Sequence, residues 1–244
     1  MTPTLSVILP VYNAGAFLDD ALRSVLRQPL AELEVIAVDD GSSDATPERL
    51  AAWSAREPRL RVIRQANAGP AAARNRGLAE ARAPLVGFID ADDLWPADKL
   101  AAQLGRLRDT PALQAISGFT TYFDRADAAG LEPAPDARRV TLFHVHLGAT
   151  LFRRELLREL GDFDPARRFS EAHDLWLRLR EAGSGFVILR QTTLFYRRHA
   201  QSMTAGKVGL GDVGLFDVLR DSLARRRARG SARDLGSFTR HLDP

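Results

Sequence analysis

Short apolar segments alternate with helical patterns along the first 90 or so residues, and this alternation restricts the possible folds more than any other feature. The apolar runs, which predict buried strands, occupy residues 5–9, 34–38, 60–64 and 85–89. Helical patterns separate these runs near residues 17–26, from residue 46 onward and over residues 71–82. Strands separated by helices of about ten to fifteen residues form right-handed βαβ units around a mostly parallel sheet. The sequence therefore predicts an α/β fold.

The second half of the chain is less regular. Strand patterns occupy residues 112–121, 149–153, 186–189 and 193–197, with a loop at 124–136 and a helix at 171–181. A basic amphipathic helix begins near residue 211 and is followed by a ragged tail. We therefore expect one domain over residues 1–205, with the basic helix and tail at 206–244.

Composition excludes several classes of protein. The chain has no cysteine, which rules out disulfides, thiolate nucleophiles and zinc sites built on cysteine. No apolar run approaches the roughly 18 residues that a membrane span needs, and the N-terminus lacks the pattern of a signal peptide. The expected location is therefore cytoplasmic, with peripheral attachment to the inner face of the plasma membrane as an option. The arginines at 225–227 and 229 favour an anionic partner surface.

Polar residues follow three of the predicted strands, at 10–13, 39–43 and 90–93. Ligands of open parallel sheets bind at the carboxyl ends of the strands. Carboxylates gathered there repel one another unless a cation intervenes, and a divalent metal bridges carboxylates to phosphate oxygens. An isolated D-x-D sequence is usually a solvated loop. Its placement directly after a buried strand, with a second acidic strand end earlier, favours a metal site at Asp92.

Six segments resemble glycosyltransferase family 2, which has the GT-A fold. They span residues 6–13 (SVILPVYN), 38–44 (VDDGSSD), 67–77 (NAGPAAARNRG), 88–93 (FIDADD), 161–179 (GDFD and DLWLRL) and 196–203 (YRRHAQSM). Each segment alone is a weak signal, but together they match in order from about residue 4 to residue 205. The resemblance implies a Rossmann-like nucleotide-binding half at residues 1–110 and an acceptor-binding half at 111–205.

The resemblance also implies roles for individual residues. It places these residues at the nucleotide: Pro10, Tyr12, Asp40, Arg74, Asp90, Ala91, His199 and Ser202. Tyr12 would face the base, and Asp40 would accept the imide hydrogen of uracil or thymine. Arg74 would face the nucleotide or form an ion pair with Asp90 or another acid. For Tyr12 and His199 the alternative is an ordinary core or turn residue.

The metal and the sugar complete these implied roles. Asp92 would bind Mn²⁺ or Mg²⁺ on the diphosphate, while Asp90 would hold the ribose or the sugar. His199 and Ser202 would approach the diphosphate from the C-terminal side. Asp93 and Trp176 would lie beside the sugar or the acceptor.

The catalytic base of the family is missing from its usual place. That base is the aspartate of an E-D pair, and the pair here reads Glu171-Ala172. Three explanations remain open: Glu171 or Asp174 acts instead, the protein is a natural low-activity member, or position 172 carries an inactivating substitution. Asp174 has an alternative role in an i,i+4 pair with Arg178. Loss of a positioned base typically lowers the rate about 10²- to 10⁴-fold.

The resulting hypothesis is an inverting hexosyltransferase of bacterial polysaccharide biosynthesis. Its donor would be a UDP- or dTDP-sugar and its acceptor a glycan or a lipid-linked hydroxyl, with no nucleic acid partner. The rival hypothesis is a catalytically inactive nucleotide-sugar-binding or assembly protein of the same fold. A nicotinamide-dependent dehydrogenase is disfavoured because the first turn lacks G-x-G-x-x-G. The donor sugar, the linkage and the oligomeric state are left open.

Two further features each allow two interpretations. His144 and His146 either line an acceptor site or alternate along the edge of a strand. The basic helix either packs on the domain or docks on an anionic membrane that carries lipid-linked acceptors. Its expected inner face holds Leu215, Val218, Leu219, Leu223 and Ala224.

Overall fold

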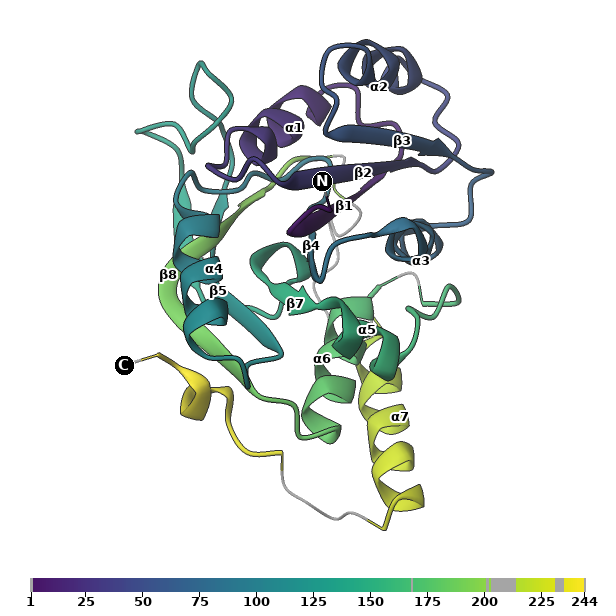
Figure 1. Ribbon diagram of the computed structural model, residues 1–244, viewed down its shortest axis with the longest axis vertical. Coiled ribbons are helices and arrows are strands. Elements are labelled where there is room, and N and C mark those ends of the chain that lie inside the picture. The colour runs from purple at the N-terminus through teal and green to yellow at the C-terminus, as the bar shows by residue number, and fades with distance from the viewer. Residues whose placement is uncertain (1, 168, 201, 203–213, 231–234, 244) are drawn as a thin grey trace.

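The computed structural model describes residues 2–167, 169–200, 202, 214–230 and 235–243 (Figure 1). Its strands are β1 (Leu5–Val11), β2 (Leu33–Asp39), β3 (Leu60–Arg64), β4 (Leu85–Phe88), β5 (Ala115–Phe123), β6 (Arg139–Leu142), β7 (Leu151–Arg153) and β8 (Phe186–Arg197). Its α-helices are α1 (Leu18–Leu26), α2 (Thr46–Ser54), α3 (Pro70–Glu80), α4 (Lys99–Asp109), α5 (Arg154–Leu160), α6 (Glu171–Glu181) and α7 (Leu215–Ala228). Short 3₁₀ helices are η1 (Leu147–Ala149) and η2 (Phe238–His241). The expected α/β fold is confirmed.

One mixed sheet runs through the molecule in the order β3-β2-β1-β4-β7-β5-β6, and β8 pairs with β5. Strands β1 to β4 are parallel, as expected from their βαβ connections. β7 is antiparallel to both β4 and β5, so it joins the parallel half to the second half. The chain moves from β1 outward to β3 and then returns to the other side of β1. The carboxyl ends of β1 and β4 therefore flank a topological switch point, which is where ligands of such sheets bind.

Two apolar cores cover the two faces of the sheet. Because side chains alternate along a strand, successive residues of β1 divide between them: Val7 faces α1, α2 and α4, whereas Ile8 faces α3, α5 and α6. Helix α3 approaches β1 closely at Gly77, where an added Cβ would lie 2.5 Å from Ile8 Cγ2. This glycine therefore lets α3 lie against β1, which brings the side chain of Arg74 to the end of the sheet.

The structure differs from the sequence-based expectations in several elements. Helices α4 and α5 and strand β6 were not expected, and β8 is one strand rather than two. β1 continues through Pro10 to Val11 instead of ending at Leu9. Proline is tolerated at this position because β4 pairs with β1 only as far as Ile8, so residue 10 has a neighbouring strand on one side only.

Helix α7 lies beside α6, as Figure 1 shows in yellow and green, but its orientation differs from the expected one. Val218 is buried, whereas Phe216, Leu219 and Leu223 are 63%, 44% and 46% exposed. The side of α7 that faces α6 carries Arg225, which pairs with Glu181 (2.8 Å) and Asp174 (3.2 Å). The expected start of this helix near residue 211 lies outside the described residues.

Candidate functional site

The acidic segment after β4 is tied to the carboxyl end of β8. Leu94 and Phe195 exchange two backbone hydrogen bonds, of 3.0 and 2.9 Å. Arg197 donates its backbone N–H to Asp93 Oδ1 (3.0 Å) and its Nε–H to the carbonyl oxygen of Asp92 (3.1 Å). The same guanidinium reaches Asp20 of α1 at 3.0 Å. Arg197, which the sequence analysis did not single out, therefore fixes the backbone that carries the acidic residues.

Asp92 and His199 lie in direct contact at this end of the sheet. Asp92 Oδ2 is 2.9 Å from His199 Nε2, and the His199 ring packs on Phe17 with centroids 4.5 Å apart. Ser202 Oγ accepts a hydrogen bond from the backbone N–H of His199 at 3.4 Å. His199 is thus placed by its neighbours to share a ligand with Asp92. A carboxylate and an imidazole at this separation form a donor set that fits a divalent metal ion, with the nitrogen favouring Mn²⁺ over Mg²⁺.

A second group of possible ligands, Asp90, Asp93 and His146, has ligand atoms within 4.8 Å of one another. It fits a metal less well. His146 Nδ1 already accepts the Gly148 N–H at 3.1 Å, so the neutral ring carries its proton on Nε2 and has no lone pair to spare. Burial, reinforced by Asp92 and Asp90, raises the pKa of Asp93 well above its usual value. Asp93 is 1% exposed and its Oδ1 accepts the Arg197 N–H, so the expected position of Asp93 beside the sugar or the acceptor is wrong.

Arg74 joins the acidic segment to the start of α6. Its guanidinium is buried and lies 2.6 Å from Asp90 Oδ1 and 2.5 Å from Glu171 Oε1. Burial alone raises the pKa of Asp90, but the charge and the hydrogen bond of Arg74 outweigh it, so the pKa is lowered. Of the two roles considered for Arg74, the structure thus shows the ion pair with Asp90, together with a bond to Glu171 that the sequence did not reveal.

Asp40 anchors the loop that leads into α3. Its Oδ1 accepts hydrogen bonds from Gln65 Nε2 (2.8 Å) and the Ala68 N–H (2.9 Å), and its Oδ2 accepts the Gly69 N–H (2.8 Å). A carboxylate has about four acceptor positions, and the protein fills three of them on Asp40, which is 3% exposed. Asp40 is therefore held rigidly at the carboxyl end of β2 with its orientation fixed.

The turn after β1 leaves one aromatic ring in solvent. Tyr12 is 54% exposed, so it is not a core residue. The turn itself is held by Asn13, whose Oδ1 accepts the Ser43 N–H (2.8 Å) and whose N–H donates to Ser42 Oγ (3.0 Å). Pro10 and Ala91 are partly buried and buried, respectively, at the adjoining strand ends. This arrangement leaves the face of Tyr12 available beside Asp40.

The start of α6 contains no free carboxylate. Glu171 is bound by Arg74, and Asp174, only 5% exposed, accepts hydrogen bonds from Arg178 Nε (3.0 Å) and Arg225 (3.2 Å). The i,i+4 pair expected for Asp174 and Arg178 is thus confirmed. Ala172 packs against the core on the α3 side of the sheet.

Trp176 has a structural position rather than the expected one beside the acceptor. Its side chain is 1% exposed and contacts the rings of Phe152 and Phe186 edge-on, with centroids 6.3 and 5.0 Å apart. A ring enclosed in this way cannot reach a bound sugar, so the assignment of Trp176 to the acceptor is wrong. The tryptophan instead fixes α6 against the sheet.

Three histidines gather beside the start of α6. The ring of His144 lies 5.6 Å from that of His173 and 6.3 Å from that of His146, which in turn lies 5.3 Å from Tyr196. Residues 143–146 belong to no strand, so the strand-edge interpretation of His144 and His146 is wrong. Burial lowers the pKa of each of these two rings to about 4, and it also lowers the pKa of His173. All three are therefore neutral near pH 7. Nothing in the sequence indicated that His173 joins this group.

Lys99 supports this histidine group indirectly. It is fully buried, and both its Nζ and Trp95 Nε1 donate to the carbonyl oxygen of Gly148, at 3.1 and 3.0 Å. Burial lowers the pKa of Lys99 well below its usual value. The N–H of the same glycine donates to His146 Nδ1. Lys99 and Trp95 therefore fix the orientation of His146 through Gly148.

Solved structures share this fold. The crystal structure of S. aureus TarS 1–349 matches 95% of this chain and 67% of its own length, with a TM-score of 0.72 and 17% identity. The mannosyltransferase PcManGT from Pyrobaculum calidifontis, in complex with GDP-Man and Mn²⁺, matches 95% of this chain and 77% of its own, with a TM-score of 0.63 and 20% identity. At such identities the likeness establishes the fold alone, which is the expected GT-A fold.

Sequence relatives extend the comparison. The chain is 31% identical over 221 residues to the uncharacterized glycosyltransferase EpsJ of Bacillus subtilis, covering 84% of this chain and 64% of EpsJ. It is 31% identical over 128 residues to the glycosyltransferase GlyG of Streptococcus pneumoniae, covering 52% of this chain and 42% of GlyG. The chain thus spans less than two thirds of the length of these relatives. The family model described as "Glycosyl transferase family 2" matches residues 6–161, which is more than half of the chain. This protein belongs to glycosyl transferase family 2.

Proposed function

We propose that this protein is an inverting glycosyltransferase that moves a sugar from a nucleotide diphosphate-sugar to a hydroxyl of a glycan or lipid-linked acceptor. The observation that carries this proposal is the contact between Asp92 and His199 at the switch point of the sheet. The ligands in solved structures of the same fold support it, since TarS has been crystallised with UDP and with UDP-GlcNAc. Those ligands belong to the other proteins, so the donor of this chain needs its own test.

In this proposal the residues around Asp92 act on the donor. Asp92 and His199 would hold the divalent ion, which when bound neutralises the charge of the departing diphosphate. Asp90, oriented by Arg74, accepts hydrogen bonds from hydroxyls of the ribose or the sugar. Asp93 is 1% exposed and accepts the Arg197 N–H, so it fixes the end of β8 below the site and does not contact the sugar. The contacts made by Asp90 and by the Asp92–His199 pair hold the anomeric carbon in place for attack from the face opposite the diphosphate, which inverts its configuration.

The base of the donor is proposed to be uracil or thymine. Asp40 is proposed to accept the imide N–H, and Tyr12 offers an exposed ring for stacking. A thermal-shift screen with manganese should show UDP- or dTDP-sugars raising the melting temperature by about 5 °C or more at a hundredfold excess over Kd. CDP-sugars serve as the control, because cytosine N3 carries no hydrogen to donate. Equal stabilisation by CDP- or GDP-sugars would contradict the assignment of the base.

A catalytically inactive binding protein would pass the same screen. The two functions are separated by product formation, because only a transferase releases UDP or dTDP in a manner that depends on an added acceptor. The contact of Asp92 with His199, and the orientation of Asp90 by Arg74 nearby, favour the enzyme. Detection of binding without release over many hours would favour the binding protein.

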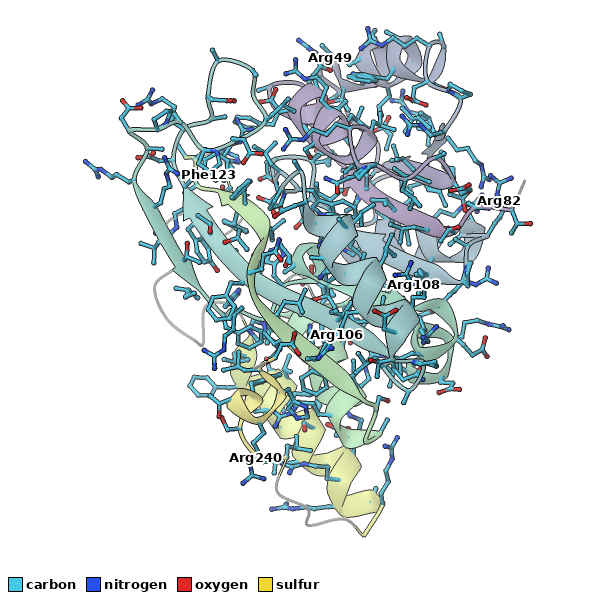
Figure 2. All side chains as sticks on the ribbon, turned by 60° about the vertical axis from the view of Figure 1, so that its left-hand side comes forward. Arg49, Arg82, Arg106, Arg108, Phe123 and Arg240 are labelled. Carbon is cyan, nitrogen blue, oxygen red and sulfur yellow. The ribbon has the colours of Figure 1, made fainter. Side chains whose placement is uncertain are left out.

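We further propose that α7 attaches the protein to an anionic membrane surface, near lipid-linked acceptors. Among the described residues, no helix is both long and apolar enough to cross a bilayer. The exposed apolar residues of α7 (Phe216, Leu219 and Leu223) share its outer side with Arg227, a combination typical of interfacial helices. Positive charge is not confined to α7, because Figure 2 labels arginines on α2 (Arg49), before β4 (Arg82), on α4 (Arg106 and Arg108) and in η2 (Arg240). Large apolar side chains are also exposed at Val62, Val140 and Leu142, so what distinguishes α7 is three of them beside arginine on one helix.

Vesicle co-sedimentation tests this attachment. The protein is expected to sediment with vesicles that contain phosphatidylglycerol, and less so as the salt concentration rises, because exposed charges are screened. The triple variant Phe216→Ser, Leu219→Ser, Leu223→Ser should lose most of this binding while its melting temperature stays unchanged. Vesicles of phosphatidylcholine alone provide the control. Equal binding of the triple variant would show that α7 is not the attachment site.

A further inference from the structure

The proposed reaction requires a group that takes the proton of the acceptor hydroxyl, and position 172 offers none. Glu171 and Asp174 were the acids considered in its place. Each is held by arginine: Glu171 by Arg74, and Asp174 by Arg178 and Arg225. A carboxylate whose lone pairs accept guanidinium hydrogens is a weak base, since the neighbouring positive charge favours the ionised form. Neither of these two acids is therefore suited to act as the base.

His173 directly follows Ala172 on α6. Its side chain is partly buried, and its Nδ1 is buried without a hydrogen-bond partner in the described part of the chain. The ring meets that of His144 nearly edge-on, at 5.6 Å and 73°. A neutral imidazole has one nitrogen with a vacant lone pair. His173 is thus the titratable side chain nearest in sequence to position 172 that has a proton-accepting atom not used by an arginine.

The groups around His173 determine its protonation. Glu171 acts on it from its own helix, His144 and His146 face it from the segment before η1, and Arg74 and Asp90 lie beyond Glu171. Burial lowers the pKa of His173, and the charge of Glu171 opposes this effect without cancelling it. The ring is therefore unprotonated at neutral pH, and Glu171 remains close enough to stabilise the imidazolium once it forms.

We propose that His173 is the general base of this enzyme. The inference rests on the proposed function. In the transfer step, the acceptor O–H bond breaks and its proton goes to Nε2 of His173, because Nδ1 is enclosed and carries the hydrogen of the neutral ring. The acceptor oxygen forms a bond to the anomeric carbon of the donor. The bond from that carbon to the phosphate oxygen breaks, and its electron pair leaves with the nucleotide diphosphate. The imidazolium afterwards returns its proton to water.

The first test is the variant His173→Gln, which keeps a polar side chain but cannot accept a proton near neutral pH. Its turnover should fall about 10²- to 10⁴-fold, whereas its affinity for the nucleotide-sugar, measured by calorimetry with manganese, should be unchanged. The wild type should lose kcat/KM as pH falls through a value below about 6.5, the ordinary pKa of histidine, and this limb should be absent from the variant. His241→Gln is the matched control, because His241 stacks on Phe186 at 3.8 Å in η2, outside the site.

The second test uses position 172, and its single variant, Ala172→Asp, does not depend on the stability of His173→Gln. If His173 already serves as the base, Ala172→Asp alone should raise turnover less than about tenfold, whereas in the His173→Gln background it should restore at least about tenfold. Normal turnover of His173→Gln would overturn the proposal, as would a gain of about 10²-fold or more from Ala172→Asp alone. Failure of the wild type to bind or cleave any nucleotide-sugar would instead refute the proposed function itself, so the two failures are distinguishable.

Discussion

Replacement of Arg74 by methionine is expected to lower the free energy of unfolding by about 3 kcal/mol, at the lower end of the range for a broken buried ion pair. Arg74 is the cation between Asp90 and Glu171, and its side chain is 6% exposed. Its removal leaves two carboxylates facing each other in a largely enclosed place. The loss stays at the lower end because Asp90 is 33% exposed and retains some hydration. Urea unfolding at pH 7 measures this difference.

The loss of unfolding free energy in Arg74→Met is expected to depend on pH. The pKa of Asp90 is lowered in the folded protein, so the pair contributes stability above the unfolded pKa of about 3.9, and this contribution is lost as pH falls through the folded pKa. The difference between wild type and Arg74→Met should therefore shrink toward acid pH. Arg76→Met is the control: Arg76 lies on the same helix, is 53% exposed and pairs with Glu80 at 3.2 Å, so its loss should cost under about 0.5 kcal/mol. If Arg74→Met lost as little unfolding free energy as Arg76→Met, the ion pairs of Arg74 would not behave as buried salt bridges.

Replacement of Asp92 by alanine is expected to reduce sugar transfer about 10²- to 10³-fold, the usual effect of removing one electrostatic contact to a developing charge. Asp92 supplies the carboxylate of the proposed metal site, and His199 alone offers one nitrogen. Excess manganese should recover part of the activity, because the site is weakened rather than closed. A coupled assay of nucleotide release, run over a range of manganese concentrations, measures both effects.

Asp98→Ala is the matched control for this substitution. Asp98 follows the same acidic segment along the chain, but it is exposed and accepts a hydrogen bond from Gln191 Nε2 at 2.7 Å, outside the site. Its removal should leave turnover within about threefold of the wild type. If the two variants were equally active, the metal site would have to lie elsewhere.

The first half of the fold was predictable from the sequence because its strands are continuous apolar runs between clear helical patterns. Helix α4 was missed for a physical reason: its buried face includes Lys99 and Gln103, whose Nζ and Nε2 atoms donate to buried carbonyl groups. These residues obscure the apolar period that marks a helix. β8 was divided in two because Arg190 and Gln191 interrupt its apolar pattern. In the structure this stretch coincides with a register shift against β5 and the chain stays extended.

The candidate site was predictable only where its residues lie within short motifs. Asp92 and His199 were each expected at the diphosphate, and the structure brings them into contact although they are far apart in the sequence. The second bond of Arg74, to Glu171, and the approach of His173 to His144 depend on how α3 and α6 pack against the sheet. Residues brought together in this way leave no local pattern. For Trp176 the sequence prediction was wrong in the other direction: a residue within a family motif was expected in the site but is part of the core.

The central claim is that a divalent ion held by Asp92 joins the diphosphate to the protein, and calorimetric titration of UDP and dTDP tests it most directly. The titrations compare the wild type in manganese, the wild type in EDTA and Asp92→Ala in manganese. Removing the ion or the carboxylate is expected to weaken nucleotide affinity at least about tenfold, because the acidic residues then repel the diphosphate. A nucleotide affinity that is the same in all three titrations would contradict the account.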